Sequence, residues 1–284
     1  MTVYDRIKLG LIGDNIKPSR SPDLHRLAGR LCGLNVTYHL LIPPEMGKDF
    51  DTVLDDCAAH GYRGVNITYP YKEQVVARVE VADPLVRRVG SVNTVVFVSG
   101  TMRGYNTDYT GFISAFRQHF GAREPGAVAM IGAGGVGKAV AFGLLVLGAT
   151  EIRIVDHDIA KADALALSLN QASDGALQAS AHAQPETALA GADGVVNCTP
   201  VGMAGYPGTP VARHLLPGCT WAFDAVYTPA QTQFISDSEA NGLRVLSGYE
   251  LFIHQGVQAF QIFTGRAPDD QDMLRQLLME GTGT

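Results

Sequence analysis

The segment NITYPYK, residues 66–72, places a lysine directly after an apolar run that is typical of a strand. Proline cannot donate to a strand ladder, and it restricts the conformation of the residue before it. The chain is therefore expected to turn sharply at Tyr-Pro-Tyr and to hold Lys72 near the carboxyl end of the strand. An ammonium group there is either a solvated surface charge or a group that exchanges a proton with a substrate.

Other polar side chains stand near the ends of predicted strands in the first 108 residues. Hydroxyls, amides and a carboxylate are the types that hydrogen-bond an alcohol or carbonyl oxygen, or exchange its proton. The candidates are Ser19 and Ser21 in SRSP, Asn66 and Thr68 before Lys72, Asn93 and Thr94 in GSVNT, and Asn106, Thr107 and Asp108. Zinc-dependent catalysis is not indicated, because the eight histidines are spread singly and form no zinc-binding pattern. Catalysis by a nucleophilic serine is not indicated either, because the GxSxG motif is absent.

The strongest motif is AVAMIGAGGVGKAVAFGLLVLGATEIRIVDHD, residues 127–158. An apolar strand enters a glycine-rich loop, a helix follows, and a second apolar strand ends in Asp156, nineteen residues after Gly137. In a dinucleotide-binding fingerprint the glycines allow a tight turn, close approach to the pyrophosphate and packing of helix on strand, and the helix N-terminus faces the phosphates. The predicted loop consists of Gly132, Ala133, Gly134, Gly135, Val136 and Gly137.

The same loop also matches GxxxxGK, the phosphate loop of nucleotide triphosphatases. That motif requires a serine or threonine next, whose hydroxyl binds Mg²⁺, and this chain has Ala139. Phosphoryl transfer is therefore disfavoured.

Asp156 indicates which dinucleotide is bound. A carboxylate at the end of the second strand can accept both ribose hydroxyls of NAD and would repel the 2′-phosphate of NADP, which usually needs an arginine. The next five residues, HDIAK, offer no arginine and a second acid. NAD is favoured over NADP, with the alternative that Asp156 only caps the following helix.

Composition narrows the class of protein. The chain has 284 residues, of which 46% are hydrophobic and 18% charged, so it is expected to be globular. A net charge of −6 without a basic run argues against nucleic-acid or membrane partners, and no segment approaches eighteen apolar residues. The first residues are too weakly apolar for a signal peptide, and the four cysteines form no CxxC pair. A cytoplasmic protein is expected.

Short apolar runs alternate with helix-period segments along the chain. Strands are expected near 6–12, 36–42, 63–68, 92–98, 127–131, 151–155, 193–197, 221–225 and 243–246. Helices are expected over 22–32, with Ser21 as N-cap, over 48–59 and from 72 to 79. Such alternation predicts a two-domain α/β chain with parallel sheets that helices cover on both faces.

The ordered motifs resemble those of the shikimate dehydrogenase family, including its quinate/shikimate branch. SRSPDLH is similar to the family's S-x-S-P-x-x-H, and NITYPYK to its N-V-T-x-P-x-K. GSVNT, GYNTD, GAGGVGKA, VNCTPVGM, YTP and the glutamine of HQGVQAF follow in the family's order. The resemblance implies reversible oxidation of a ring hydroxyl, from shikimate to 3-dehydroshikimate or from quinate to 3-dehydroquinate.

The resemblance also implies that one domain binds the substrate and another binds the dinucleotide. Residues 1–104, completed by C-terminal helices 248–284, would form an α/β substrate-binding domain. Residues 105–247 would form a Rossmann-type parallel-sheet domain for the dinucleotide. Lys72 and Asp108 match the family's catalytic pair, in which the lysine exchanges the hydroxyl proton and the aspartate orients it or shares the proton.

Further positions take roles by the same resemblance. The implied substrate-binding residues are Ser19, Ser21, Asn66, Thr68, Asn93, Tyr227 and Gln255. The implied cofactor-binding residues outside the glycine-rich loop are Asp156, Thr199, Met203, Val226 and Gly248. Structural alternatives remain for Ser21 as a helix cap, for Asn93 as a partner of turn backbone and for Tyr227 as a packing residue. His25 and His254 are expected to be packed core histidines.

Three departures from the family pattern qualify the expectation. Arg26 stands where the family usually has asparagine, and Asp156-His157-Asp158 replaces a basic segment, which favours NAD. Ser21 resembles the shikimate-specific form, whereas the quinate branch often has threonine there. The alternatives are an aminoshikimate or other cyclitol dehydrogenase and a non-catalytic NAD- and shikimate-binding regulator. Either a monomer or a homodimer is compatible with the sequence.

Overall fold

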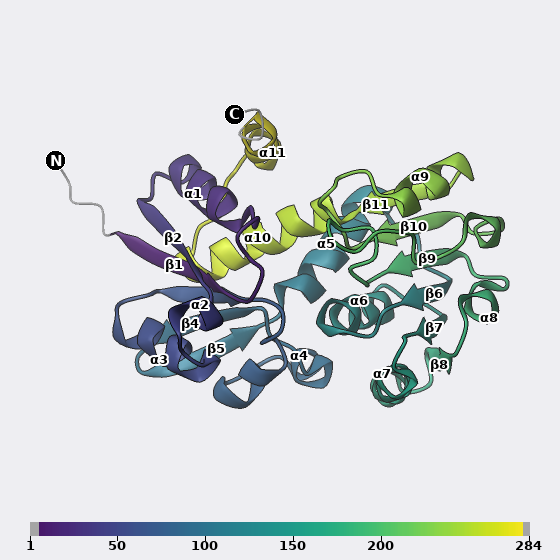
Figure 1. Cartoon of the computed structure of the whole chain (residues 1–284), viewed down its shortest axis with the longest axis horizontal. Coiled ribbons are helices and arrows are strands. Elements are labelled where there is room, and N and C mark those ends of the chain that lie inside the picture. The colour runs from purple at the N-terminus through teal and green to yellow at the C-terminus, as the bar shows by residue number, and fades with distance from the viewer. Residues whose placement is uncertain (1–5, 281–284) are drawn as a thin grey trace. The chain divides into compact units, whose positions relative to one another are not determined.

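Strand pairing builds two separate sheets in the computed structural model, which describes residues 6–280. Contacts divide the chain into one unit that extends to Thr107 and resumes at Ile253, and a second unit from Asp108 to Phe252 (Figure 1). The extreme ends of the first predicted domain, residues 1–5 and 281–284, lie outside the described residues.

The sheet of the first unit has the strand order β2-β1-β3-β4-β5. Its strands are β1 (Ile7–Ile12), β2 (Val36–Leu41), β3 (Gly64–Ile67), β4 (Thr94–Val98) and β5 (Thr101–Tyr105). The expected parallel pairing holds for β1, β2 and β3, whereas β4 runs antiparallel to both β3 and β5. Ser99 and Gly100 reverse the chain between β4 and β5 with positive φ angles of 49° and 81°. This turn matches the right-handed twist of a hairpin, and β5, which the sequence analysis missed, exists as its second arm.

Helices of the first unit begin and end at recognisable signals. They are α1 (Ser21–Leu31), α2 (Pro43–Met46), α3 (Phe50–Ala59), the 3₁₀ helix η1 (Gln74–Arg78), α4 (Pro84–Val89) and α11 (Gln271–Glu280). Asp49 caps α3 by accepting a hydrogen bond from the Thr52 N–H at 2.7 Å. The predicted cap of α1 is wrong: Ser21 is its first residue, and Arg20 stands at the cap without a side-chain bond. The predicted helix 72–79 is shorter, since Lys72 belongs to a turn and η1 starts at Gln74.

The second unit contains a six-stranded parallel sheet in the order β11-β10-β9-β6-β7-β8 (Figure 1). The strands are β6 (Ala127–Ile131), β7 (Glu151–Val155), β8 (Gln178–His182), β9 (Gly194–Asn197), β10 (Trp221–Asp224) and β11 (Arg244–Ser247). The strand order reverses between β6 and β9, where Ile131 pairs with Asn197. Ligands of doubly wound sheets bind outside the carboxyl ends of strands at such a switch point. The predicted Rossmann-type architecture is confirmed.

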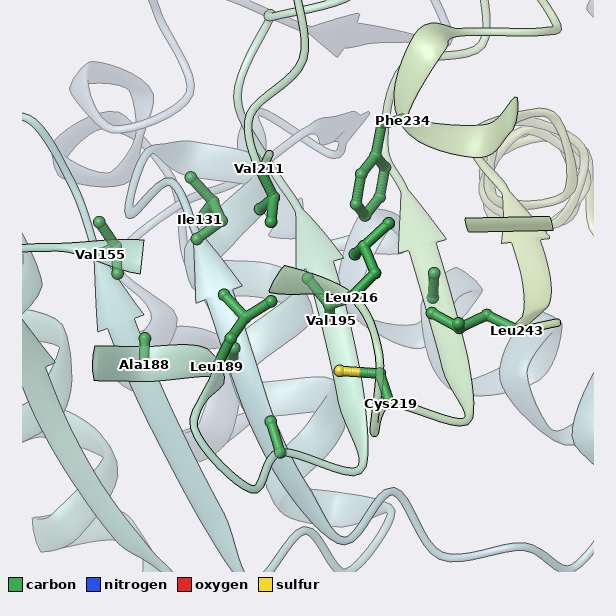
Figure 2. Close-up of a cluster of buried hydrophobic side chains, with 13 residues drawn as sticks. Ile131, Val155, Ala188, Leu189, Val195, Val211, Leu216, Cys219, Phe234 and Leu243 are labelled. Atoms are coloured by element: carbon green, nitrogen blue, oxygen red, sulfur yellow. The ribbon is translucent and has the colours of Figure 1, made fainter. Parts of the chain in front are cut away.

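Side chains of this sheet alternate between two packed faces. Helices of the unit are α5 (Thr107–Phe120), α6 (Gly135–Val146), α7 (Ile159–Ser173), α8 (Pro185–Leu189), η2 (Arg213–Leu215), α9 (Gln233–Ala240) and α10 (Gly248–Thr264), the last of which continues into the first unit. Val195 of β9 packs in a buried cluster with Leu189 of α8 and Phe234 of α9 (Figure 2). On the other face, Phe223 and Trp221 of β10 make edge-on contacts with rings of α5. Across residues 6–280 no helix has both the length and the apolar character needed to cross a membrane.

Candidate functional site

Lys72 follows a turn that several interactions hold in place. The Tyr71 N–H donates to Thr68 O at 2.9 Å, and the Tyr71 hydroxyl donates to Asp14 at 2.9 Å. The Tyr71 ring stacks on Phe50 with centroids 4.7 Å apart. The carbonyl of Lys72, a half-buried residue, accepts from Val92 N–H at 2.9 Å. The predicted sharp turn is confirmed, and it fixes the lysine backbone beyond the carboxyl end of β3.

Two predicted residues, Asn66 and Asn93, share one buried network. The Asn66 amide donates to Thr94 Oγ1 at 3.1 Å and to the Asn93 carbonyl at 3.3 Å, while its oxygen accepts from the Tyr38 hydroxyl at 2.9 Å. Asn93 Oδ1 accepts from the Thr107 N–H at 2.7 Å, and Asn93 Nδ2 donates to Thr107 Oγ1 at 2.9 Å. The network therefore joins the carboxyl end of β3 and the start of β4 to Thr107 within the first unit.

Ser19 and Ser21 lie together at the start of α1. Their hydroxyl oxygens are 3.2 Å apart, and the Ser21 N–H donates to Ser19 Oγ at 3.3 Å. Both residues are half-exposed, so each hydroxyl can reach a ligand. A helix start with adjacent hydroxyls suits an anionic group such as a carboxylate.

Thr68 and Gln255 complete the predicted substrate-binding residues of the first unit. Thr68 comes directly after β3, where its N–H donates to Ile12 O at 2.9 Å. Gln255 is half-buried on α10. The neighbouring Gly256 packs so tightly on α1 that a Cβ atom there would lie 2.6 Å from Leu24. This close approach sets Gln255 on the helix that packs against the one begun by Ser21.

His25 packs against Tyr38, the residue whose hydroxyl donates to Asn66 in the buried network. Its ring stacks on Tyr38 with centroids 4.6 Å apart, and it is 2% exposed. Burial lowers the pKa of His25 to about 3, although a hydrogen bond with Asn66 raises it. A histidine with this pKa is neutral at physiological pH, which agrees with the expected role as a packed core residue.

Three glycines of the glycine-rich loop in the second unit each have a distinct structural reason. Gly132 has φ of 102°, and a Cβ atom there would lie 2.8 Å from the Cys198 carbonyl carbon. A Cβ atom on Gly137 would lie 2.2 Å from Gly132 O, whereas one on Gly134 would meet no protein atom within 4 Å. The backbone at Gly134, the N-cap of α6, is thus open to a ligand. These residues fit the pyrophosphate of a dinucleotide.

Asp156 contacts that loop directly. Its Oδ2 accepts from the Ala133 N–H at 2.7 Å, and its Oδ1 accepts from the Asp158 N–H at 2.9 Å. The helix-cap alternative for Asp156 is wrong, because Asp158 is the N-cap of α7 and bonds the Ala160 N–H at 3.2 Å. His157 Nδ1 also lies 3.0 Å from Oδ1, so Oδ2, which within residues 6–280 accepts only from Ala133, keeps the clearer capacity for a ribose hydroxyl.

A second network, centred on Asp224, was not anticipated from the sequence. Asp224 Oδ1 accepts from Asn197 Nδ2 at 2.9 Å and from the Val226 N–H at 3.0 Å, and Oδ2 accepts from Thr232 Oγ1 at 2.6 Å. Asn197 Oδ1 in turn accepts the N–H and hydroxyl of Thr199 at 3.0 and 2.7 Å. Burial raises the pKa of Asp224 above its ordinary value. An aspartate that ends an apolar strand, WAFD, was the available signal.

The remaining predicted residues belong to the second unit as well. The Tyr227 ring stacks on Phe252 with centroids 5.0 Å apart and an interplanar angle of 11°. Gly248 begins α10 so close to the turn after β10 that a Cβ atom would lie 2.5 Å from Ala225 O. Met203 is 39% exposed in the loop after β9, and Asp108 is 7% exposed in the first turn of α5.

The structure thus groups the predicted residues in two sets. One set, in the first unit, holds Ser19, Ser21, Asn66, Thr68, Lys72, Asn93 and Gln255, and the other, in the second unit, holds Asp108, the glycine-rich loop, Asp156, Thr199, Met203, Val226, Tyr227 and Gly248. Within residues 6–280 no three histidine, cysteine or acidic side chains are grouped to hold a metal ion.

Family models match three parts of the chain. The shikimate dehydrogenase substrate binding domain matches residues 11–95, and the shikimate 5′-dehydrogenase C-terminal domain matches residues 248–278. The saccharopine dehydrogenase NADP binding domain matches residues 128–204. The first two confirm the resemblance seen in the motifs, and the third agrees with a dinucleotide-binding second unit.

Whole-chain relatives lead to the same family. The quinate/shikimate dehydrogenase (NAD(+)) of Corynebacterium efficiens is 38% identical over 275 residues, covering 95% of this chain and 97% of the relative. The shikimate dehydrogenase (NADP(+)) of Streptomyces avermitilis is 40% identical, with 96% and 95% covered. The solved quinate dehydrogenase from Corynebacterium glutamicum in complex with NAD superposes with a TM-score of 0.88 at 36% identity, covering 97% of this chain and 99% of that one.

Proposed function

The chain belongs to the shikimate dehydrogenase family, and on that premise we propose that it interconverts shikimate, with quinate as a second substrate, and the corresponding 3-dehydro acids. Members of this family are alcohol oxidoreductases that use a nicotinamide dinucleotide. The observation that carries the substrate proposal is the set of hydroxyl, amide and ammonium groups at the strand ends and helix start of the first unit.

We assign proton transfer to Lys72 and Asp108. A bound dinucleotide would supply the acceptor for the hydride that leaves the carbon bearing the reacting hydroxyl. The hydroxyl proton must leave in the same direction of reaction, and a positioned side chain contributes typically about 10²–10⁴-fold to such a transfer. Lys72 receives this proton at Nζ in the proposal, and the carboxylate of Asp108 orients the ammonium group or shares the proton. The turn that anchors Tyr71 supports the role of Lys72 because it restrains the lysine backbone.

The hydroxyls of Ser19 and Ser21 are proposed to bind the substrate carboxylate. Thr68, Asn66 and Gln255 are proposed to bind ring hydroxyls, together with Tyr227. Asn93 is engaged by Thr107 through both ends of its amide. One N–H of that amide remains for substrate, so its larger task in this proposal is to hold the strand end in shape.

NAD is the proposed cofactor, and Asp156 is the principal reason. A 2′-phosphate beside this carboxylate would be repelled unless an arginine compensated for it. Arg153, on the same strand, is already held by Glu151 through bonds of 2.8 and 2.6 Å. The glycine-rich loop, Thr199, Met203, Val226 and Gly248 are proposed to line the remainder of the dinucleotide site.

Initial oxidation rates with shikimate and with quinate, each with NAD⁺ and with NADP⁺, test these proposals. The expected result is turnover with NAD⁺ and at least one of the two acids. Higher rates with NADP⁺ would overturn the cofactor assignment and leave the substrate assignment intact. If the folded protein shows turnover in none of the four mixtures, the substrate assignment is overturned. That result would favour a dehydrogenase of a different cyclitol or a protein that binds these ligands without catalysis.

A cytoplasmic location and a monomeric or homodimeric state complete the proposal. The four cysteines, Cys32, Cys57, Cys198 and Cys219, are free thiols, as expected in a reducing compartment. Sedimentation equilibrium of the purified chain distinguishes the two oligomeric states.

A further inference from the structure

Asp224 ends β10 in register with Asn197, the last residue of β9. Both side chains are completely buried, with exposed fractions of 0%. The three donors to the Asp224 carboxylate are neutral, namely the Asn197 amide, the Val226 N–H and the Thr232 hydroxyl. A buried carboxylate with neutral donors is costly, because removal of the charge from water is compensated only through hydrogen bonds.

One consequence of this arrangement is that a single carboxylate organises the loop after β9. Asn197 is oriented by its bond to Asp224 and in turn accepts both donors of Thr199 and donates to Val201 O at 3.2 Å. Thr199 Oγ1 also accepts from the Val201 N–H at 3.2 Å. The conformation of residues 198–201 is therefore set by a chain of bonds that begins at the carboxylate.

The same carboxylate organises the turn after β10. The hydrogen bond that Asp224 Oδ1 accepts from the Val226 N–H fixes the turn directly after the strand. On its other side Thr232 donates to Asp224 and accepts from the Ile235 N–H at 3.1 Å as the N-cap of α9. Removal of the carboxylate would thus loosen two loops and one helix start together.

Both loops lie against the proposed dinucleotide-binding backbone. A Cβ atom on Gly132 would come within 2.9 Å of Thr199 Cγ2, and one on Gly248 would come within 2.8 Å of Asp224 O. The glycine-rich loop and the start of α10 therefore pack on the segments that Asp224 holds. A small displacement of either segment would move the backbone that faces the cofactor.

We propose that Asp224 is a positioning residue for the dinucleotide, which holds the loops after β9 and β10 in the shape that cofactor binding requires. This inference rests on the proposed function, since it assumes that the second unit binds NAD. Asp224 acts through Asn197, Thr199 and Val226, and it takes no part in hydride or proton transfer. Its two oxygens accept from all three neutral donors at one centre, which an amide with a single acceptor oxygen cannot do.

Asp224→Asn tests the proposal with the smallest change in shape. The new amide nitrogen cannot accept the hydroxyl proton of Thr232, so the bond from Thr232 Oγ1 to the position of Oδ2 is lost and that buried hydroxyl loses its acceptor. The KM for NAD⁺ should rise roughly tenfold, as expected for the loss of about one such bond. The KM for shikimate and kcat at saturating NAD⁺ should change less than about twofold, because the first unit is untouched. Binding of NADH, followed by its fluorescence, should weaken by the same factor.

Asp237→Asn is the matched control. Asp237 is also buried in the second unit, at 8% exposure, but its carboxylate accepts from Gln233 on its own helix at 3.0 Å. Its KM for NAD⁺ should remain at the wild-type value. Equal NAD⁺ KM values for wild type and Asp224→Asn would overturn the proposal, as would equal losses in both variants. Wild-type protein that binds no NADH would instead overturn the proposed function on which the inference rests.

Thr232 provides a second test should Asp224→Asn fail to fold. Thr232→Val removes the hydroxyl that donates to Asp224, whereas Thr232→Ser keeps it. The valine variant should show a several-fold higher KM for NAD⁺ and the serine variant a value near wild type. If the folded valine variant keeps the wild-type KM, the carboxylate does not position the cofactor site and the proposal is wrong.

Discussion

Polar groups at the strand ends differ in charge between the two units. In the first unit, Asn66, Thr94, Asn93 and Thr107 are neutral and satisfy one another. In the second, two of the strands are followed by or end in carboxylates, namely Asp156, which holds the Ala133 N–H, and Asp224, which holds the neutral Asn197. Neutral groups build a network whose shape does not depend on pH, while a carboxylate can gather several donors and so hold a loop. The comparison suggests that the first unit offers a preformed surface and the second a loop framework fixed by charge.

The largest effect should come from Lys72→Met in the first unit. We expect kcat to fall about 10²–10⁴-fold while NADH binding stays unchanged, because the proposed proton acceptor is lost and the second unit is intact. Lys17→Met, at an exposed lysine paired with Glu45 in the same unit, should retain wild-type kcat. Steady-state rates and NADH titration measure both. Weaker NADH binding by Lys72→Met would break the separation of roles between the units.

Asn93→Ala should produce the next largest effect, on stability. The substitution leaves the buried Thr107 N–H without its acceptor and removes the partner of its hydroxyl, which should cost about 2–3 kcal/mol in the free energy of unfolding. Urea unfolding measures this loss. Asn241→Ala, which removes a single partly buried bond to Asp237 O, is the control and should cost less than about 1 kcal/mol. Equal costs would mean that the neutral network does not stabilise the first unit.

His25→Phe tests whether the buried His25 ring in the first unit is neutral in the folded protein. The folded pKa of about 3 lies below the ordinary value of 6.5, so the unfolded chain takes up the proton first as pH falls. The free energy of unfolding should therefore fall by about 1.4 kcal/mol per pH unit through this group below pH 6.5. His25→Phe should lose less stability than wild type between pH 7 and pH 5, by roughly 2 kcal/mol, in urea titrations.

The exposed His214 supplies the control for that experiment. His214→Gln should show the same acid dependence as wild type. An unchanged slope in His25→Phe would show that His25 becomes protonated in the folded protein, contrary to its burial against Tyr38.

The smallest effect concerns Glu151 at the amino end of β7. The bond from Arg153 lowers the pKa of Glu151, so the pair contributes stability above the unfolded pKa and loses it as pH falls through the folded one. Glu151→Gln should cost about 0.5 kcal/mol near pH 7 and less near pH 3, because a single, partly exposed ion pair is weak. Thermal unfolding at the two pH values measures the difference. A larger cost would show that charge matters throughout the second sheet and not only at its carboxyl end.

Local signals predicted a large part of the fold. The turn at NITYPYK, the glycine-rich loop and the apolar strands β6 and β7 could be recognised because each depends on neighbouring residues. The family resemblance and the two-domain α/β architecture are confirmed. The roles of individual site residues stay predictions, and the structure adds contacts that make several of them specific.

Features that depend on distant partners could not be predicted. The strand β8, QASAH, has small and polar residues without an apolar run, and it exists because β7 offers a pairing edge. Asp224 and Asn197 are 27 residues apart and meet only because β9 and β10 pair in one register. Ser21 resembles a helix cap in sequence, but the chain enters α1 one residue earlier.

The chain has a single tryptophan, Trp221, and it lies completely buried at the start of β10. Its indole N–H donates to Pro125 O at 3.0 Å, and the Phe116 ring stands edge-on to it at 5.2 Å. Indole emission therefore comes from the second unit alone, whereas far-ultraviolet circular dichroism records the helices of both. Unfolding curves from the two signals that coincide would reveal one cooperative transition, and curves that separate would reveal two. The protein thus carries an intrinsic optical reporter that distinguishes its units without any label.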